Sequence, residues 1–175
     1  METPNIDHLR YPIGTYKPPV DISAELVRVW INDIEKLPHQ LRELVSNYSA
    51  QQFDTPYRPG GWTVRQVIHH VADSHMNAYI RFKWALTEDN PTIKYYFEDR
   101  WAELPEAKTA PVDVSLNLLE ALHHRWVLAM NQMSTSDFLR PFTHPEIGNT
   151  KSLAFYCGLY AWHGKHHLEH VRLVK

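Results

Sequence analysis

Histidine is the residue type in this sequence whose number and spacing point most directly to chemistry. The 175-residue chain contains 12 histidines but only one cysteine, Cys157. Four of the histidines crowd into the segment YAWHGKHHLEH, at positions His163, His166, His167 and His170. Imidazole is the commonest metal ligand in proteins, whereas a thiolate cage needs several cysteines. The pattern therefore favours a metal site built from histidine.

Helical spacing divides these four histidines into two pairs. Residues four apart on a helix lie one above the other on the same face. His163 and His167 form such a pair on the face that carries Tyr160, and their rings are predicted to point inward. His166 and His170 form a second pair on the neighbouring stripe. Periodicity alone leaves both pairs open as metal ligands.

The segment WTVRQVIHHVADSH supplies a further candidate ligand. His70 falls on the apolar stripe of a predicted helix, whereas His69 falls on its polar side. His70 is thus the inward candidate, and His69 is expected to be solvated. His75 also lies on the apolar stripe, where a histidine is more often a hydrogen-bonded core residue than a ligand.

Five further residues are candidates for the wall of a substrate pocket. Three of them follow His70 at helical spacing, and their polar groups could bind a carboxylate or an amide. The other two are aromatic residues whose alternative role is core packing. The five are Ser74, Asn77, Arg81, Tyr160 and Trp62. For Arg81 an ion pair with an acid on a neighbouring helix is an equally open alternative.

The elements that must position these residues are four amphipathic helices. Apolar residues recur at helical spacing over residues 23–48, 63–90, 112–133 and from 152 onward. Ser23, Thr63 and Asp113 are suited to cap the first, second and third helices. Residues 1–22 hold four prolines and are predicted to form an extended surface arm. We expect one domain over residues 1–175, an all-α four-helix bundle.

A length argument sets the direction of the helices. At about 1.5 Å per residue, His70 lies about 10 Å from the start of its helix. His163 and His167 lie roughly 20 Å from the start of theirs but only about 13 Å from its end. His70 therefore lies at the same height along the bundle as His163 and His167 only if the two helices are antiparallel. An up-down-down-up bundle provides this, and the long connection over residues 89–111 is predicted to be the crossover that it requires.

Composition narrows the class of partner. The 18 lysines and arginines nearly balance the 20 aspartates and glutamates, so no basic surface for nucleic acid or an anionic membrane is expected. No apolar run is long enough to span a membrane, and the N-terminal residues lack the order of a signal peptide. A cytoplasmic protein with a small-molecule substrate is the expectation.

Three neutral imidazoles with an open fourth position are typical of catalytic zinc. Such a site lowers the pKa of a bound water to about 7 and would support hydrolysis. The same site could instead bind and deprotonate a substrate thiol for transfer. A third alternative is a metal-binding bundle without turnover. The zincin motif is absent, because Gly164 stands where that motif has its glutamate; no general base is assigned.

Three segments resemble the YfiT-type members of the DinB-like superfamily: YPIGTYKPP, DTPYRPGGWTVRQVIHHVADSHMNAYIRFK and GLYAWHGKHHLEH. In that superfamily a tryptophan, here Trp62, precedes the first metal histidine, here His70, and an H-x-x-x-H pair, here His163 and His167, completes the site. The resemblance implies an up-down-down-up bundle, one divalent zinc or nickel ion per subunit, frequent homodimers and metal-dependent hydrolysis. Some relatives are similar instead to thiol S-transferases that join bacillithiol-like thiols to electrophiles.

Overall fold

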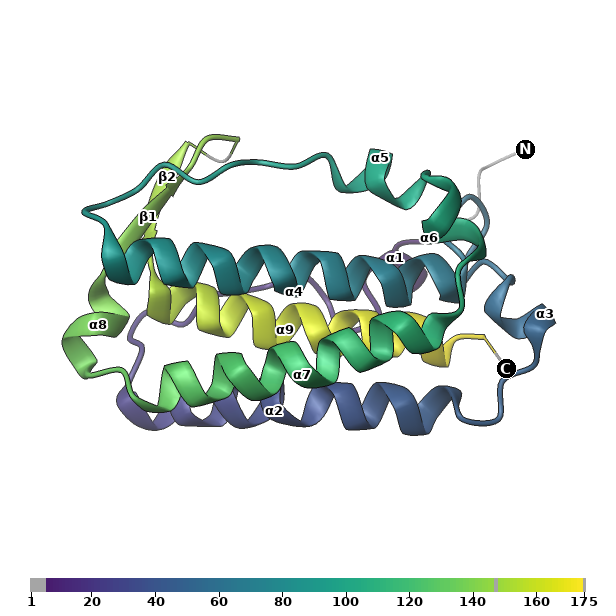
Figure 1. Cartoon of the computed structure of the whole chain (residues 1–175), viewed down its shortest axis with the longest axis horizontal. Coiled ribbons are helices and arrows are strands. Elements are labelled where there is room, and N and C mark those ends of the chain that lie inside the picture. The colour runs from purple at the N-terminus through teal and green to yellow at the C-terminus, as the bar shows by residue number, and fades with distance from the viewer. Residues whose placement is uncertain (1–5, 147, 175) are drawn as a thin grey trace.

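Four long helices form a bundle (Figure 1). The computed structural model describes residues 6–146 and 148–174. The helices lie close to the predicted ranges: α2 Ala24–Val45, α4 Val64–Thr87, α7 Val112–Asn131 and α9 Leu153–Arg172. Each packs on two others, in the ring order α2, α9, α4, α7. The predicted all-α four-helix bundle is confirmed.

The helix directions are also those predicted. Helices α2 and α9 run one way along the bundle and α4 and α7 run the other way, which makes α4 and α9 antiparallel neighbours (Figure 1). The connection between α4 and α7 travels the full length of the bundle and contains the short helices α5, Glu98–Ala102, and α6, Pro105–Thr109. The topology is therefore up-down-down-up, with the long crossover between the second and third long helices.

Side-chain caps define where the two site-bearing helices begin. The Thr63 hydroxyl accepts a hydrogen bond from the Gln66 amide, and the Gln66 side chain accepts one from the Thr63 amide in return. Ser152 caps α9 by accepting from the Phe155 amide. These bonds satisfy amide groups that have no partner inside the helix. They fix the register in which each helix presents its histidines.

A small hairpin precedes α9 and was not predicted from the sequence. Strands β1, Pro141–His144, and β2, Asn149–Ser152, pair antiparallel, with Pro141 opposite Ser152. They follow the short helix α8, Thr135–Leu139. Strands of four residues are too short to show a clear alternation of apolar and polar side chains. The hairpin buries Phe142, whose ring stacks on Tyr156 with centroids 3.9 Å apart.

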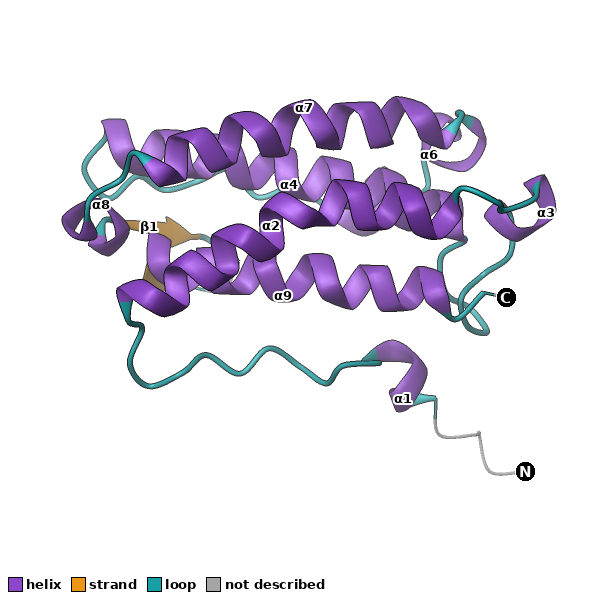
Figure 2. Cartoon of the chain, turned by 90° about the horizontal axis from the view of Figure 1, so that it is seen from below, coloured by secondary structure: helices purple, strands orange, loops and turns teal. Residues whose placement is uncertain are grey.

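The N-terminal arm lies along α9 (Figure 2). It contains one helical turn, α1, Asp7–Arg10, and is otherwise without regular structure up to α2. The Tyr16 hydroxyl donates to the Phe155 carbonyl, which fastens the middle of the arm to α9. Residues 1–5 of the predicted arm lie outside the described residues. One more short helix, α3, Ala50–Phe53, follows α2. Among the described residues, none of the helices has the length and apolarity that a membrane span requires.

Candidate metal centre

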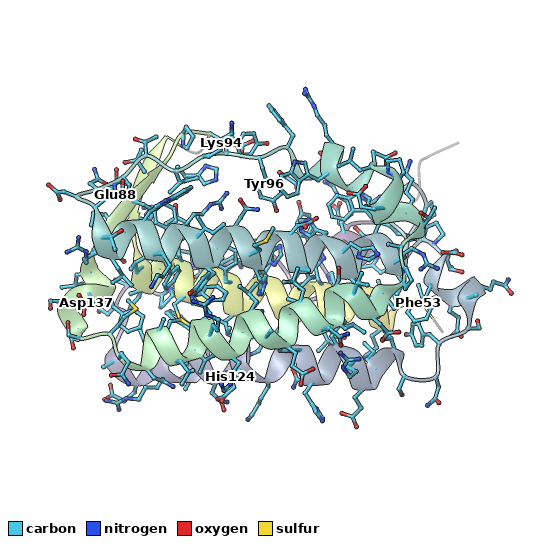
Figure 3. All side chains as sticks on the ribbon, viewed as in Figure 1. Phe53, Glu88, Lys94, Tyr96, His124 and Asp137 are labelled. Carbon is cyan, nitrogen blue, oxygen red and sulfur yellow. The ribbon has the colours of Figure 1, made fainter. Side chains whose placement is uncertain are left out.

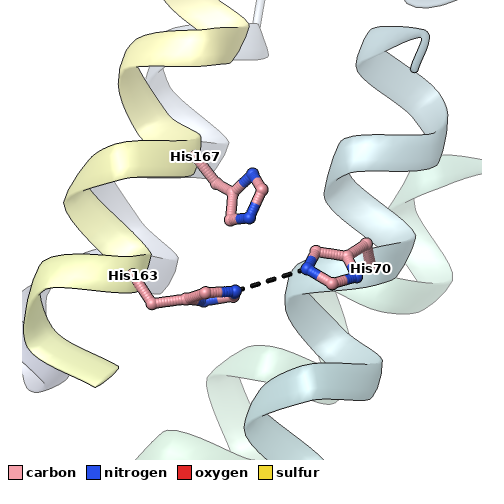
Figure 4. Close-up of side chains that lie close together, drawn as sticks. All are labelled: His70, His163 and His167. Carbon is pink, nitrogen blue, oxygen red and sulfur yellow. Dashed lines mark hydrogen bonds between the residues drawn. The ribbon is translucent and has the colours of Figure 1, made fainter. Parts of the chain in front are cut away.

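Helices α4 and α9 bring His70, His163 and His167 together (Figure 4). One ring nitrogen from each lies within 4.8 Å of the others. The Nε2 atoms of His70 and His163 are 3.3 Å apart. Two nitrogens bound to zinc at about 2.0–2.1 Å with tetrahedral angles lie about 3.3 Å apart. The geometry of this pair therefore suits a tetrahedral metal ion.

Burial keeps these imidazoles uncharged. It lowers the pKa of His70 to about 3, with further help from the positive charge that His166 and His170 would carry if protonated. Burial likewise holds the pKa of His163 and that of His167 well below the ordinary value. A histidine must be neutral to offer a lone pair to a metal. At neutral pH all three side chains meet that condition.

A chain of hydrogen bonds fixes which nitrogen of His163 carries its proton. At the far end the Ile34 carbonyl can only accept, so Nδ1 of His123 donates to it over 2.6 Å. Nε2 of His123 then accepts from Nδ1 of His75, at 2.9 Å. Nε2 of His75 in turn accepts from Nδ1 of His163, at 3.2 Å. The lone pair of His163 therefore lies on Nε2, which faces Nε2 of His70 and accepts a hydrogen bond from it.

A second chain does the same for His167. Nε2 of His170 donates to the Arg10 carbonyl of the N-terminal arm, at 3.1 Å. Nδ1 of His170 therefore accepts from Nδ1 of His167, at 3.3 Å. The free lone pair of His167 again lies on Nε2. Metal-binding histidines usually donate their other ring N–H to such a partner, so the surroundings as well as the three rings fit a metal.

The other histidines correct parts of the sequence interpretation. His69 is only 7% exposed, and the expectation that it is solvated is wrong. Its Nδ1 accepts from the Ser115 hydroxyl and its Nε2 donates to the Ala110 carbonyl, so it points away from the cluster. His166 and His170 are also buried and line the cavity beside the cluster. His75 is a hydrogen-bonded core residue, as expected.

The three histidines open into a cavity of about 560 Å³. Four of the five pocket candidates line it, namely Trp62, Ser74, Arg81 and Tyr160. The fifth, Asn77, is not among the lining residues, and its amide donates to the Asp73 carbonyl within α4. The Trp62 ring packs 4.7 Å from that of His70, between centroids.

Sequence periodicity missed the residues that reach the cavity from outside the long helices. The crossover contributes Tyr95 and Tyr96, the latter lying over α4 (Figure 3). The hairpin contributes His144, and the arm contributes Arg10 and Tyr11. Four of the five have aromatic or imidazole side chains, and the abundance of such residues in these segments was the only signal that the sequence offered. Their positions depend on how these segments fold back over the bundle.

Comparison with known proteins agrees with this architecture. The family model of the DinB superfamily matches residues 33–171. Proteins of Bacillus cereus strain G9842 and Bacillus anthracis strain CDC 684, both named "Putative metal-dependent hydrolase", are 57% and 56% identical over 172 residues, covering 97% of each chain.

Solved structures show the same fold. One is described as "YfiT from Bacillus subtilis is a probable metal-dependent hydrolase with an unusual four-helix bundle topology"; it matches with a TM-score of 0.92 and 48% identity over 94% of each chain. A mycothiol-dependent maleylpyruvate isomerase shares the fold at a TM-score of 0.67 and 19% identity, over 83% of this chain and 60% of that one. With a family match that spans most of its length and close relatives that align from end to end, this chain belongs to the DinB superfamily.

Proposed function

We propose that this protein is a metal-dependent hydrolase of a small-molecule substrate. The observation that carries the proposal is the set of three neutral imidazoles, His70, His163 and His167, which bring one ring nitrogen each within 4.8 Å of the others beside an open cavity. Three histidines with a free fourth position are the ligand set of catalytic zinc, whereas structural sites use four protein ligands. We propose one divalent ion per chain, with zinc as the first candidate and nickel as the second.

Each part of the site has a role in this chemistry. The bound ion would supply a water whose pKa is lowered to about 7 and would polarise the bond to be cleaved. His75 and His170 hold the ligand rings in the orientation and tautomer that the ion requires. Trp62 covers one side of His70 and keeps solvent from it. The cavity volume of about 560 Å³ suits a small organic molecule.

Metal content per chain tests the ligand assignment. His70→Ala, His163→Ala and His167→Ala should each retain much less zinc after dialysis than the unaltered protein, because each removes one of three ligands. His39→Ala is the matched control, since His39 is an exposed histidine on α2 far from the cluster. Full zinc content in the His70→Ala variant would contradict the assignment.

Product analysis separates the proposed hydrolysis from its alternatives. The zinc-loaded protein is incubated with a panel of esters and amides, and in parallel with a low-molecular-weight thiol plus an electrophile. We expect water to be added to one substrate. A thioether formed from the thiol and the electrophile would show that the protein catalyses thiol S-transfer and not hydrolysis. Bound metal with no product in either panel would identify a metal-binding bundle without turnover.

A further inference from the structure

Arg81 is a buried cation that forms no ion pair with any acid among residues 6–146 and 148–174. It lies on α4 eleven residues after His70, on the same face of the helix, and its side chain is only 5% exposed. A guanidinium remains charged at any pH at which the protein is folded. Burying such a charge is costly unless an acid or several hydrogen bonds compensate it. A buried Arg81 is therefore expected to have a binding partner that compensates its charge.

Among the described residues, the Arg81 guanidinium finds one hydrogen-bond acceptor, and it does so through Nη1. Nη1 donates to the Tyr160 hydroxyl at 2.9 Å. Nε is fully buried, and no described residue accepts a hydrogen bond from Nε or from Nη2. The Nε and Nη2 groups form the edge of the guanidinium that receives a carboxylate with two parallel hydrogen bonds. This edge is free.

The neighbours of Arg81 are aromatic and uncharged. The guanidinium carbon lies 5.9 Å from the ring centre of Tyr96. His144 is close enough that the charge of Arg81, added to burial, lowers the pKa of His144, so its ring is neutral. Nδ1 of His144 is a second buried polar atom without a partner in the same cavity. Two unsatisfied polar groups thus converge on one region of the cavity.

The cavity contains carboxylates, but none of them neutralises Arg81. Glu98, Asp99 and Glu146 line the same space. None has an oxygen within 4.0 Å of a guanidinium nitrogen of Arg81. Asp99 and Glu146 are exposed to solvent, which places them on the outer rim. The intramolecular ion pair that the sequence left open as the alternative role of Arg81 is thus not formed by these acids.

We propose that Arg81 binds a carboxylate group of the substrate. The assignment rests on the proposed function in one respect: the rest of the substrate is then placed at the cluster of His70, His163 and His167. Tyr160 joins the two ends, because its hydroxyl accepts from Arg81 while its ring centre lies 6.1 Å from that of His163. The carboxylate and the reacting bond are separated by about the length of a tyrosine side chain.

A monoanion fits this pocket better than a dianion. One guanidinium supplies a single positive charge, and the three acids that line the cavity repel a second negative charge. The planar Nε and Nη2 edge matches the two oxygens of a carboxylate. The substrate class is therefore a small organic acid whose carboxylate lies a few bonds from the group that reacts.

Monohydroxamates of dicarboxylic acids are suitable probes. Their hydroxamate end binds a metal ion and their other end carries a free carboxylate; the series from glutaric to suberic acid varies the separation. Each is compared with its neutral primary amide by calorimetric titration. We expect the acid of matching length to bind about 10-fold or more tightly than its amide, as a charge-assisted hydrogen-bonded pair implies. Arg81→Gln should abolish that preference and leave the affinity for the amide unchanged.

Matched variants separate this role from others. Arg125→Gln alters an exposed arginine on α7 and should keep the full preference for the acid. Arg81→Lys retains the positive charge but lacks the two parallel N–H groups. This variant should therefore keep only part of the preference for the acid. Circular dichroism shows whether Arg81→Gln folds. If it does not, the role of Arg81 is tested by the acid–amide comparison in Arg81→Lys and in the unaltered protein.

The outcomes also distinguish this proposal from the proposed function. Titrations are repeated on the metal-free protein, in which the preference for the acid should persist because Arg81 belongs to the chain. Equal affinity for acid and amide in a protein that binds metal stoichiometrically would overturn the role of Arg81 alone. A preference for the acid in a protein that binds no metal would support Arg81 and contradict the hydrolase. A preference that survives Arg81→Gln would overturn the proposal.

Discussion

Imidazole side chains within two turns of α9 perform different tasks because their neighbours differ. His163 and His167 have their Nδ1 protons held by other histidines, which places their lone pairs on Nε2. Both ring nitrogens of His170 are instead engaged in hydrogen bonds, and one of these bonds is to the N-terminal arm. Spacing in the sequence shows which rings share a face. It does not show which nitrogen is free.

Removing His75 should therefore weaken metal binding without removing a ligand. In His75→Leu, Nδ1 of His163 loses its acceptor, and we expect the dissociation constant for zinc to rise about 10- to 100-fold. His75→Gln offers an amide oxygen as acceptor and should recover part of the affinity. His69→Ala is the control, because His69 is also buried but its hydrogen bonds go to Ser115 and Ala110 and not to a ligand.

Nitrogen-15 spectra of the histidine rings give an independent readout of the tautomer. In the unaltered protein His163 should carry its proton on Nδ1 alone, and in His75→Leu both tautomers should appear. A single unchanged tautomer together with unchanged zinc affinity in His75→Leu would show that the chain of histidines does not orient His163.

At the scale of elements, α9 approaches α2 closely because two glycines face it. A Cβ atom on Gly164 would lie 2.5 Å from Cδ2 of Leu37, and one on Gly158 would lie 2.8 Å from two atoms of the Trp30 ring. The position of Gly164 within the histidine cluster thus reflects helix packing. Residues on the facing helix determine it.

Gly158→Ala should reduce stability although alanine favours helices. The gain in helix propensity is about 1 kcal/mol, whereas forcing a methyl group against the rigid Trp30 ring costs about 1–3 kcal/mol. We expect a net loss in the free energy of unfolding, measured by urea denaturation, and a shift of the Tyr16 contact that this glycine also makes. The double variant with Trp30→Leu should recover stability; unchanged stability in the single variant would contradict the close packing.

The sequence predicted those elements whose formation depends on the local spacing of their own apolar and capping residues. Four long helices, the caps Ser23 and Thr63, and the antiparallel crossing follow from local residue types, from apolar spacing and from matching the levels of His70 and His163. The predicted cap Asp113 is wrong, because α7 begins at Val112 and Asp113 lies within its first turn. The hairpin, the one-turn helix of the arm and the cavity residues Tyr96 and His144 do not, because contacts between distant segments position them. His69 was misplaced for the same reason: Ala110 and Ser115, from the crossover and α7, cover the polar side of α4.

At the scale of the whole molecule, the buried histidines make the fold sensitive to acid. Burial lowers the pKa of His123, of His166 and of His170 to about 4 each, below the value near 6.5 expected in the unfolded chain. Between these values the unfolded chain binds more protons than the folded one. The stabilisation is therefore complete above about pH 6.5 and is lost progressively as the pH falls toward 4.

Urea titrations of the metal-free protein across this range measure the effect. Each such histidine should lower the free energy of unfolding by about 1.4 kcal/mol per pH unit within the window. His123→Gln should reduce the slope by roughly one histidine's share, whereas the exposed His39→Gln should not change it. A free energy of unfolding independent of pH between 6.5 and 4.5 would contradict this account.

A homodimer is expected in solution, since members of the superfamily that this chain resembles frequently pair and aromatic residues make up 12% of it. Light scattering should give about twice the chain mass of 20.6 kDa. A mass near 20.6 kDa at all concentrations would exclude the dimer.

Metal loading should stabilise the whole bundle, because the proposed ligands come from α4 and α9 and the ion would join two helices that are distant in sequence. An ion that binds only the folded chain adds about 2.7 kcal/mol to the free energy of unfolding when its free concentration is 100 times the dissociation constant. For a chain of this size that corresponds to a rise in melting temperature of about 5–10 °C. Calorimetric melts with and without zinc measure the rise. His167→Ala should lose most of it while His39→Ala keeps it, because only the first removes a ligand. An equal rise in both variants would mean that zinc binds elsewhere on the chain.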